Sequence, residues 1–325
     1  MRQPEVEVLL ATYNGEQFIR EQIESILTQD YSCLRILASD DGSRDETVTI
    51  LVEYAQQYPS RFRMLAQQER TGSAKANFLR LMKASTAEYA CFADQDDVWL
   101  PSKVGRSMEA MQRLENQYGK NLPLLVFTDL RVVDEHLKTI HSSMWNLMDV
   151  DPKCIHRLER LVNRSLVTGC TSMINRPMLE LARTMPEGAT MHDRWIGLLA
   201  AAMGAAAFLP EQTVFYRQHE NNVIGAGTKP SFIASVRRAV NGRGRRAERA
   251  RSEREAALLL DLYGSRMSER SAAILRAYLQ SGRSESAMKR VATTLRYRFT
   301  RGNLLKDLVT LFDLAFAKSD EHPEG

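Results

Sequence analysis

Short apolar runs alternate with helix-forming segments along the first part of this chain, and the alternation limits the folds open to it. Residues 6–12, 34–39 and 89–93 are rich in apolar and β-branched side chains, as buried strands are. Between them, residues 17–28 and 45–58 repeat their apolar side chains with the period of a helix. Strands that alternate with helices form a mostly parallel sheet with helices on both faces, so we expect an α/β fold.

The rest of the chain divides into a less regular region and a helical region. Further strands are expected at residues 124–128, 166–174 and 213–216, where apolar, extended segments return. Beyond them the pattern becomes almost wholly helical, with glycines between the segments. We therefore predict an α/β domain over residues 1–228 and a helical C-terminal region over residues 229–325.

The composition narrows the class of protein. With 44% apolar and 26% charged residues, the chain can bury a core, which argues against disorder. Its four cysteines are widely spaced and form no C-x-x-C pair, so we expect reduced thiols. P-loop, α/β-hydrolase and zincin motifs are absent from the sequence. The start lacks the features of a signal peptide, and the longest apolar stretch, residues 195–209, is too short to cross a bilayer. We therefore expect a cytoplasmic protein.

The positive charge is concentrated in one tract. The net charge is +4, yet residues 237–254 alone hold eight Arg and two Glu, so the rest of the chain is close to neutral. Such a tract can attract nucleic acid or anionic lipid, and a solvated helix face explains it equally well. It holds no aromatic residue, which disfavours stacking on single-stranded nucleic acid. Residues 304–316 carry an apolar stripe that fits a membrane surface or a protein partner.

Three carboxylates follow the apolar strand at residues 89–93. Asp94, Asp96 and Asp97 lie so close together that, unpaired, they repel one another and raise one another's pKa. A divalent cation relieves that repulsion, and hard oxygen ligands suit Mg²⁺ or Mn²⁺. An exposed acidic turn explains this motif alone equally well.

Two other turns follow predicted strands and suit a nucleotide base. Asp41 lies in a Ser-Asp-Asp-Gly-Ser turn after the second strand, and its carboxylate can accept a hydrogen bond from N3–H of uracil or thymine. The structural alternative is ordinary turn chemistry with a capping box of Ser43 and Glu46. Tyr13 follows the first strand, where an aromatic ring can flank a planar base.

Two later motifs carry side chains for proton transfer and for metal or phosphate binding. Asp193 can take the proton of an attacking hydroxyl group, or it can simply cap the helix expected to begin there. His219 can add an imidazole nitrogen to a metal site, or it can lie in a loop without that role. Arg217 offers either a forked phosphate contact or a solvated charge.

In their order along the chain, these motifs resemble those of the family 2 glycosyltransferases of GT-A fold, a Rossmann-related architecture. The resemblance is carried by residues 8–14, 39–43, 93–101 and 192–193. It covers about residues 5–225. The segment Ala-Asp-Gln-Asp-Asp-Val-Trp-Leu-Pro at residues 93–101, with Tyr-Arg-Gln-His at residues 216–219 and Asn222, is similar to the bacterial rhamnosyltransferase-like branch.

The resemblance implies a role for each matching position. The donor nucleotide-sugar positions of the family correspond to Ala11, Tyr13, Asp41, Lys75, Asp94, Gln95 and Arg217. Of these, Ala11, Tyr13 and Asp41 would line the base pocket. The metal positions correspond to Asp96 and His219, and the position of the catalytic base corresponds to Asp193. Where the family often has Asn-x-Gly before its third helix, this chain has Arg-Thr-Gly at residues 70–72.

The activity implied by the resemblance is inverting, metal-dependent sugar transfer. A dTDP- or UDP-sugar, with dTDP-L-rhamnose as first choice, would donate its sugar to a hydroxyl of a bacterial surface polysaccharide or its lipid-linked precursor. Mg²⁺ or Mn²⁺ would be the cofactor, and the C-terminal helices would meet the inner face of the cytoplasmic membrane. Two alternatives stay open: a sugar-nucleotide-binding or scaffold protein without transfer, and nucleic-acid binding through residues 237–254. A nucleic-acid partner is not expected, and the sequence leaves the oligomeric state open.

Overall fold

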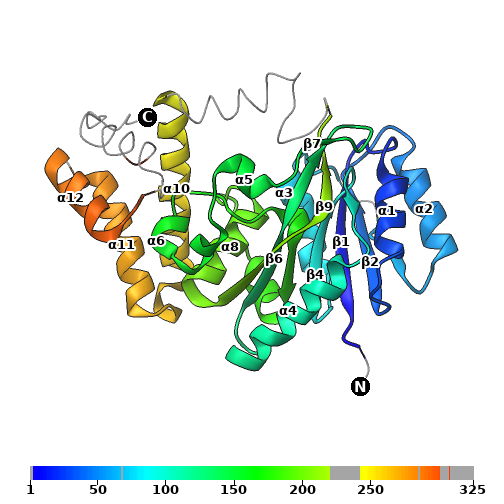
Figure 1. Ribbon diagram of the computed structural model, residues 1–325, viewed down its shortest axis with the longest axis horizontal. Coiled ribbons are helices and arrows are strands. Elements are labelled where there is room, and N and C mark those ends of the chain that lie inside the picture. The colour runs from blue at the N-terminus through cyan, green and yellow to red at the C-terminus, as the bar shows by residue number, and fades with distance from the viewer. Residues whose placement is uncertain (1–2, 67–68, 220–241, 285, 301–306, 308–325) are drawn as a thin grey trace.

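One sheet of nine strands runs through the computed structural model, which describes residues 3–66, 69–219, 242–284, 286–300 and 307 (Figure 1). The strand order is β3-β2-β1-β4-β8-β6-β9-β5, and β7 pairs with β6. The strands are β1 (Val6–Thr12), β2 (Leu34–Asp40), β3 (Phe62–Met64), β4 (Tyr89–Asp94), β5 (Val98–Trp99), β6 (Leu124–Val133), β7 (Thr139–His141), β8 (Ser172–Asn175) and β9 (Ala205–Arg217).

Helices cover both faces of the sheet and one end of the molecule (Figure 1). They are α1 (Ile19–Leu27), α2 (Thr47–Gln57), α3 (Ala74–Ala84), α4 (Lys103–Tyr118), α5 (Met144–Met148), α6 (Leu158–Leu161), α7 (Arg176–Ala182), α8 (His192–Met203), α10 (Gly242–Tyr263), α11 (Glu269–Arg283) and α12 (Ala287–Tyr297), with short 3-10 turns η1 (Pro152–His156), η2 (Gly169–Thr171) and η3 (Gly264–Arg266). Successive side chains of β1 point to opposite faces of the sheet, and each face has its own apolar core. Val8 and Leu10 pack with α1, α2 and α4, and Leu9 packs with α3 and α8.

The sheet is parallel in its first part and mixed in its second. β1 runs parallel to β2 and β4, and β2 runs parallel to β3, as the alternation of strands and helices predicted. β8 runs antiparallel to β4 and β6. The prediction of a strand over residues 166–174 is wrong for most of that length, because only Ser172–Asn175 pairs. Thr171 and Ser172 donate their hydroxyls to carbonyls three residues earlier, which favours the observed turn over a strand.

The register of the parallel strands brings three predicted motifs to one edge of the sheet. Ala11 of β1 lies opposite Ser39 of β2 and opposite Asp94 of β4. Beyond the strand, the N–H of Asp41 donates to the carbonyl of Thr12 at 2.9 Å. Because the carboxyl ends of parallel strands meet at one edge, the loops after β1, β2 and β4 share one rim.

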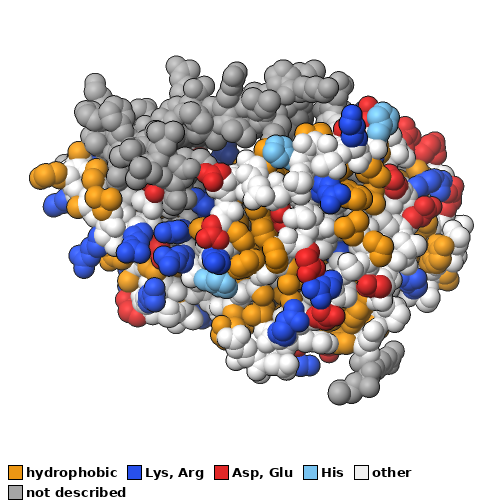
Figure 2. Space-filling view, viewed as in Figure 1, with side chains coloured by type: hydrophobic (Ala, Val, Ile, Leu, Met, Phe, Trp, Pro, Cys, Tyr) orange, Lys and Arg blue, Asp and Glu red, His pale blue; other side chains and the backbone are white. Residues whose placement is uncertain are grey.

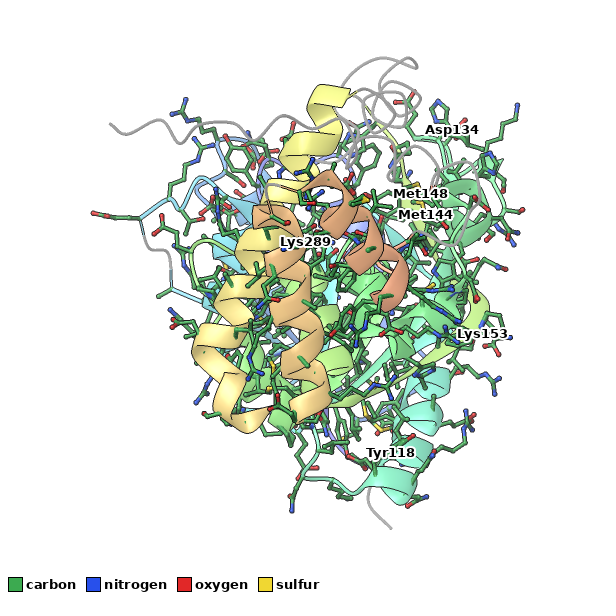
Figure 3. The ribbon with its side chains drawn as sticks, turned by 90° about the vertical axis from the view of Figure 1, so that its left-hand side faces the viewer. Tyr118, Asp134, Met144, Met148, Lys153 and Lys289 are labelled. Atoms are coloured by element: carbon green, nitrogen blue, oxygen red, sulfur yellow. The ribbon has the colours of Figure 1, made fainter. Side chains whose placement is uncertain are left out.

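At the far end of the molecule, α10, α11 and α12 pack against one another (Figure 3). Ser268 and Ser286 cap α11 and α12 by accepting hydrogen bonds from backbone N–H groups of the first turn. The described part of the C-terminal region is therefore helical, as predicted. Its predicted start after residue 228 lies outside the described residues, so the division into two domains stays a prediction.

Part of the predicted interaction surface also lies outside the described residues. The basic tract at residues 237–254 is described as helix only from Gly242 onward. The apolar stripe at residues 304–316 is not described apart from Asp307, and neither is Asn222. Among the helices that the structure does describe, none has the length and hydrophobicity needed to span a membrane.

Candidate active site

The loops after β1 and β2 are joined to each other at the rim of the sheet. Asn14 adopts a left-handed backbone with φ of 49°, and its side-chain oxygen accepts from the Arg44 N–H at 2.9 Å. Its own N–H donates to the Ser43 hydroxyl at 2.8 Å. The alternative of a capping box between Ser43 and Glu46 is wrong, because α2 begins at Thr47 without a side-chain cap and Ser43 bonds the neighbouring loop.

The two neighbouring aspartates of the second loop have different surroundings. Asp40 supports the turn itself, since its Oδ2 accepts from the N–H groups of Gly42 at 3.0 Å and Ser43 at 2.8 Å. Asp41 is buried, and its Oδ1 accepts from the Thr71 N–H at 2.6 Å. Thr71 belongs to the Arg-Thr-Gly segment in which the chain departs from the family pattern. That segment therefore still reaches Asp41.

The ring of Tyr13 lies where three loops meet. The Arg70 guanidinium carbon lies 4.3 Å from the ring centroid. Gln95 holds the Tyr13 backbone from the other side: its Oε1 accepts from the Tyr13 N–H at 2.7 Å, and its Nε2 donates to the Tyr13 carbonyl at 2.9 Å. Gln95 thus positions Tyr13, and Ala11 lies two residues earlier in β1. Sequence reasoning did not select Arg70, although its place beside the unusual Arg-Thr-Gly turn was a signal.

Carboxylates from distant segments meet beside the end of β4. Asp94 ends β4, Asp96 follows in the next turn, and Asp193 comes from the first turn of α8. Burial raises the pKa of Asp94 to about 7, and repulsion from Asp96 and from Asp193 adds to the rise. Because Asp94 interacts with both of the others, the D-x-D motif formed by Asp94 and Asp96 lies in one site with Asp193, the predicted base.

The imidazole of His219 completes a pair with Asp96. His219 Nε2 lies 2.8 Å from Asp96 Oδ2, and both side chains are largely buried. The His219 ring also packs on Phe18, with 4.9 Å between ring centroids. A carboxylate and an imidazole nitrogen form a donor set that fits Mn²⁺ or Mg²⁺. The structure thus brings together the two predicted metal ligands, whose role stays a prediction.

Asp97 lies deeper than this pair. Burial raises its pKa well above the usual range, and repulsion from Asp96 and Asp94 adds to the rise. Ligand atoms of Asp94, Asp97 and Cys170 lie within 4.8 Å of one another. Asp97 therefore packs beneath the rim, away from solvent.

A buried lysine near Asp97 was missed by sequence reasoning. Lys103 of α4 is fully buried, and its ammonium nitrogen lies 4.4 Å from the centroid of the Trp99 ring. Burial lowers the pKa of Lys103, while attraction by nearby acidic groups, Asp97 among them, opposes that change. Its only signal in the sequence is a lysine two residues after Pro101, where a helix begins.

Asp193 is held at the start of α8 by two backbone donors. The helix begins at His192 after Met191, so the alternative that Asp193 caps the helix is wrong. Its Oδ1 accepts from the Arg194 N–H at 2.6 Å, and its Oδ2 accepts from the Gly169 N–H at 3.3 Å. Burial raises the pKa of Asp193 to about 6, which suits a group that takes up a proton near neutral pH.

The neighbouring His192 supports Asp193 from below. Its ring lies between Phe78 and Phe92, at centroid distances of 4.1 and 4.8 Å. Burial lowers the pKa of His192 to about 3, so the ring is neutral. A Cβ on Gly169 would lie 2.7 Å from its Nε2, which explains a glycine at the position that donates to Asp193.

Arg217 braces the turn that carries the carboxylates. The buried guanidinium donates through Nε to the Asp96 carbonyl at 2.8 Å and pairs with Glu21. It also lies 4.4 Å from the centroid of the Phe18 ring. This geometry gives Arg217 a positioning role, and its predicted contact with phosphate stays a prediction.

Lys75 joins α3 to the loop that precedes Asp193. Its Nζ donates to the carbonyls of Glu187 at 2.6 Å and Ala189 at 2.9 Å. The ammonium group therefore supports the loop in this structure. A contact between Lys75 and a diphosphate stays a prediction.

Comparison with known proteins agrees with this geometry. Residues 7–124 match the family model of Glycosyl transferase family 2. A dTDP-rhamnosyl transferase, RfbG of Shigella flexneri, is 29% identical over 234 residues, which span 70% of this chain and 77% of that protein. Residues 7–124 therefore form a family 2 glycosyltransferase domain. An uncharacterized glycosyltransferase of Nostoc is 26% identical to it over 236 residues, which span 70% of this chain and 69% of that protein.

Solved structures agree on the fold of this glycosyltransferase. Staphylococcus aureus TarS 1-349 in complex with UDP-GlcNAc superposes with a TM-score of 0.55 at 12% identity, covering 96% of this chain and 90% of that one. The mannosyltransferase PcManGT of Pyrobaculum calidifontis, in complex with GDP-Man and Mn²⁺, gives a TM-score of 0.52 at 16% identity, covering 96% and 88%. The predicted GT-A-like α/β fold with a helical C-terminal region is therefore confirmed.

Proposed function

We propose that this glycosyltransferase moves a sugar from a dTDP- or UDP-sugar to a hydroxyl of a bacterial surface polysaccharide or its lipid-linked precursor. The observation that carries the proposal is the meeting of Asp94, Asp96 and Asp193 on the rim that also holds Asp41 and Tyr13. The name of the Shigella relative supports dTDP-L-rhamnose as the leading donor. The nucleotide complexes of TarS support the wider class of nucleotide-sugar donors.

In this proposal each side chain of the rim has a separate role in the reaction. The Tyr13 ring flanks the base, and the Asp41 carboxylate accepts from its N3–H. Asp193 takes the proton of the acceptor hydroxyl as that oxygen attacks the anomeric carbon, while the nucleotide diphosphate leaves from the opposite face. Such a single displacement inverts the anomeric carbon. Gln95 holds Tyr13 in place, which helps to orient the base of the donor.

The same residues provide a place for a divalent cation. Asp96 and His219 would hold Mn²⁺ or Mg²⁺. Burial is the main cause of the raised pKa of Asp94, and repulsion from Asp96 and Asp193, which a cation would relieve, adds to the rise. When bound, such an ion is a Lewis acid that neutralises charge on the departing diphosphate. The Mn²⁺ in the complex of the Pyrobaculum mannosyltransferase supports this assignment.

A nucleotide-sugar panel tests the proposed activity. With Mn²⁺ present, we expect dTDP-L-rhamnose to raise the melting temperature by a few degrees at about 100 times its Kd, and to be consumed with release of dTDP. Stabilisation without release would favour the non-catalytic alternative. If no dTDP- or UDP-sugar changed the melting temperature or was consumed, the proposal would be rejected.

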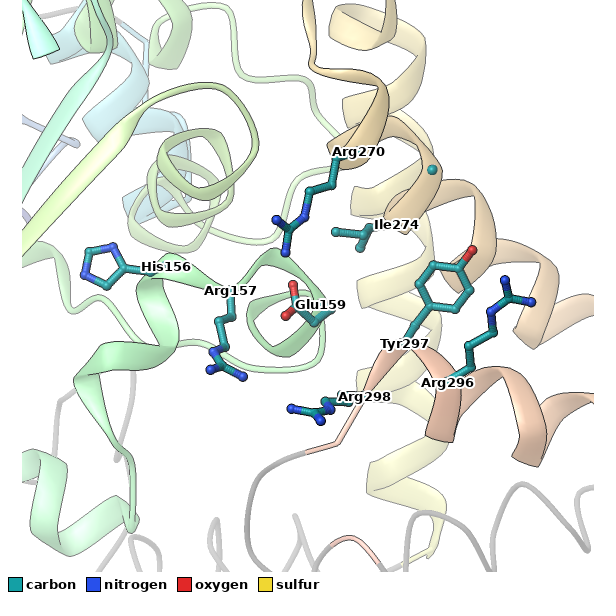
Figure 4. Close-up of a pocket in the computed structure, with 9 residues that line it drawn as sticks. His156, Arg157, Glu159, Arg270, Ile274, Arg296, Tyr297 and Arg298 are labelled. Atoms are coloured by element: carbon teal, nitrogen blue, oxygen red, sulfur yellow. The ribbon is translucent and has the colours of Figure 1, made fainter.

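A basic pocket supports an anionic membrane surface as partner. The pocket, of about 530 Å³, lies between η1 and α6 on one side and α11 and α12 on the other (Figure 4). Among the described residues, its lining includes Arg157, Arg270, Arg296 and Arg298 and a single carboxylate, that of Glu159. Figure 2 shows Lys and Arg side chains gathered on this part of the molecule, where Figure 1 places α6 and α11.

In the described part of the chain, these arginines lack the ion pairs that several other surface arginines form. Within the described residues, none of the four pairs with a carboxylate. Other arginines do form such pairs, namely Arg20, Arg35, Arg106, Arg176, Arg183, Arg249 and Arg276. On α12, the exposed apolar side chains of Met288 and Leu295 lie two helical turns apart and so share a face. Unpaired arginines beside exposed apolar groups suit a surface of anionic phospholipid.

Vesicle flotation tests the membrane partner. We expect the protein to float with phosphatidylcholine vesicles that contain phosphatidylglycerol, and not with phosphatidylcholine alone. Arg157→Ala, Arg270→Ala and Arg298→Asn combined should weaken binding on the order of 100-fold, because each arginine contributes about 1 kcal/mol. Asn is chosen because Arg298 has φ of 56°.

The matched control removes the same charge from paired arginines elsewhere. Arg20, Arg106 and Arg183 each form an ion pair on another part of the surface, and all three are changed to Ala. An equal loss of binding in the two triple variants would point to net charge alone and would contradict a pocket-specific contact.

A further inference from the structure

Helix α10 forms hydrogen bonds with the segment that carries Asp193. The side chain of Glu255 on α10 is fully buried, and its two oxygens point to residues on either side of Asp193. Oε1 accepts from the Thr190 N–H at 2.8 Å. Oε2 accepts from Arg194 Nε at 2.5 Å. One carboxylate from the C-terminal region thus holds both flanks of Asp193.

Further hydrogen bonds fix the side chain of Arg194, which together with Glu255 and Thr190 we call the clamp. Arg194 Nη2 donates to the hydroxyl of Ser252, also on α10, and to the carbonyl of Val162, both at 2.9 Å. The backbone N–H of the same arginine donates to Asp193 Oδ1 at 2.6 Å. The guanidinium and the backbone donor belong to one residue, so holding the guanidinium also fixes a hydrogen bond to the carboxylate of Asp193.

The loop before Asp193 packs tightly on the same helix. A Cβ added to Gly188 would lie 3.1 Å from Leu258 Cδ1 and 3.3 Å from Arg254 Cδ, both side chains of α10. A buried carboxylate is costly unless it is paired and hydrogen-bonded, and within the described part of the chain Glu255 meets both conditions through this loop and Arg194. The loop, the arginine and α10 therefore hold one arrangement together.

We infer that Glu255 is a positioning residue, which sets the place of the Asp193 carboxylate through Thr190 and Arg194. The inference rests on the proposed function, because it takes Asp193 as the base. It assigns the C-terminal helical region a part in the transfer step as well as in the fold.

The test compares two neutralised glutamates on the same helix. Glu255→Gln keeps the shape of the side chain but removes the charge that holds Arg194. We expect kcat for nucleotide release, with the donor chosen by the panel, to fall about 10- to 100-fold, because small displacements of a reacting group are costly. The Kd for dTDP in Mn²⁺ should stay within about twofold, since the hydrogen bonds of Glu255 go to Thr190 and Arg194 and to none of the proposed nucleotide-binding residues.

Glu253→Gln is the matched control. Glu253 pairs with Arg249 at 2.8 Å, so this variant also loses an ion pair, but Glu253 has no described contact with the Asp193 loop. It should leave kcat and the dTDP Kd within about twofold. A fall in kcat no larger than that of the control, or a parallel loss of dTDP binding in Glu255→Gln, would overturn the inference.

A milder variant covers the case in which Glu255→Gln does not fold. Ser252→Ala removes the hydrogen bond to Arg194, together with a contact of the hydroxyl with Tyr278, and should lower kcat about threefold with unchanged dTDP binding. No change in kcat would count against the clamp. If Asp193→Asn retained wild-type kcat, the proposed function itself would fail. If Asp193→Asn lost activity while the α10 variants did not, only the positioning role would fail.

Discussion

Asp193→Asn is expected to lower kcat for sugar transfer by about 10²- to 10⁴-fold, because the amide cannot take the proton of the acceptor hydroxyl. The substitution preserves shape, and the amide oxygen can still accept from the Arg194 N–H, the shorter of the two backbone hydrogen bonds. Donor binding should therefore survive, with the Kd for dTDP within about twofold of wild type. Nucleotide release and calorimetric titration of dTDP measure the two quantities separately.

The pH dependence of the wild-type enzyme gives a second readout of the same residue. Burial raises the pKa of Asp193 to about 6, and only the ionised form acts as a base. The rate should therefore be sustained above that pH and fall as the pH drops through about 6. Asp151→Asn, at an exposed helix cap that Asn also serves, is the control and should retain both rate and profile. Near wild-type turnover in Asp193→Asn would refute its role as base.

The strand ends of the first half could be predicted from the sequence because their signals are local. Apolar runs at residues 6–12, 34–39 and 89–93 are buried strands, and each ends within one residue of the predicted position. Parallel neighbours must present their carboxyl ends at one edge, so the proximity of Asp41 to Tyr13 and of both to the D-x-D turn follows from topology.

Periodicity did not reveal the strand inside the apolar stretch at residues 195–209. Nearby, an extended segment was expected only at residues 213–216, yet strand β9 begins at Ala205, directly after helix α8 ends at Met203 and Gly204 follows. The chain passes from helix to strand at Gly204, where a Cβ would lie 2.1 Å from the carbonyl oxygen of Pro123. That close approach is a tertiary contact, and only the position of a distant strand reveals it.

The partners of buried charges were also beyond sequence reasoning. Arg217 and Lys75 were predicted as donor contacts from residue type, and the structure gives both of them protein partners. Glu255 drew no attention because its partners, Thr190 and Arg194, are far from it in the sequence. Pairing of buried charges depends on which elements pack together, and a single sequence does not determine this.

Asp96→Ala is the second substitution with a large expected effect. It removes the carboxylate of the pair with His219, leaving an imidazole as the only predicted metal ligand there. We expect the affinity for dTDP in the presence of Mn²⁺ to fall more than about tenfold, because a divalent ion links the protein to the diphosphate charge. Asp151→Asn again serves as control and should bind dTDP like wild type.

Calorimetric titration of dTDP into the wild-type protein, with Mn²⁺ and then with a chelator, tests most directly whether the rim binds a nucleotide diphosphate through a metal held by Asp96. We predict tight binding only with Mn²⁺, and weak binding of Asp96→Ala under both conditions. Equal affinity of the wild-type protein with and without the metal, unchanged in Asp96→Ala, would contradict the account.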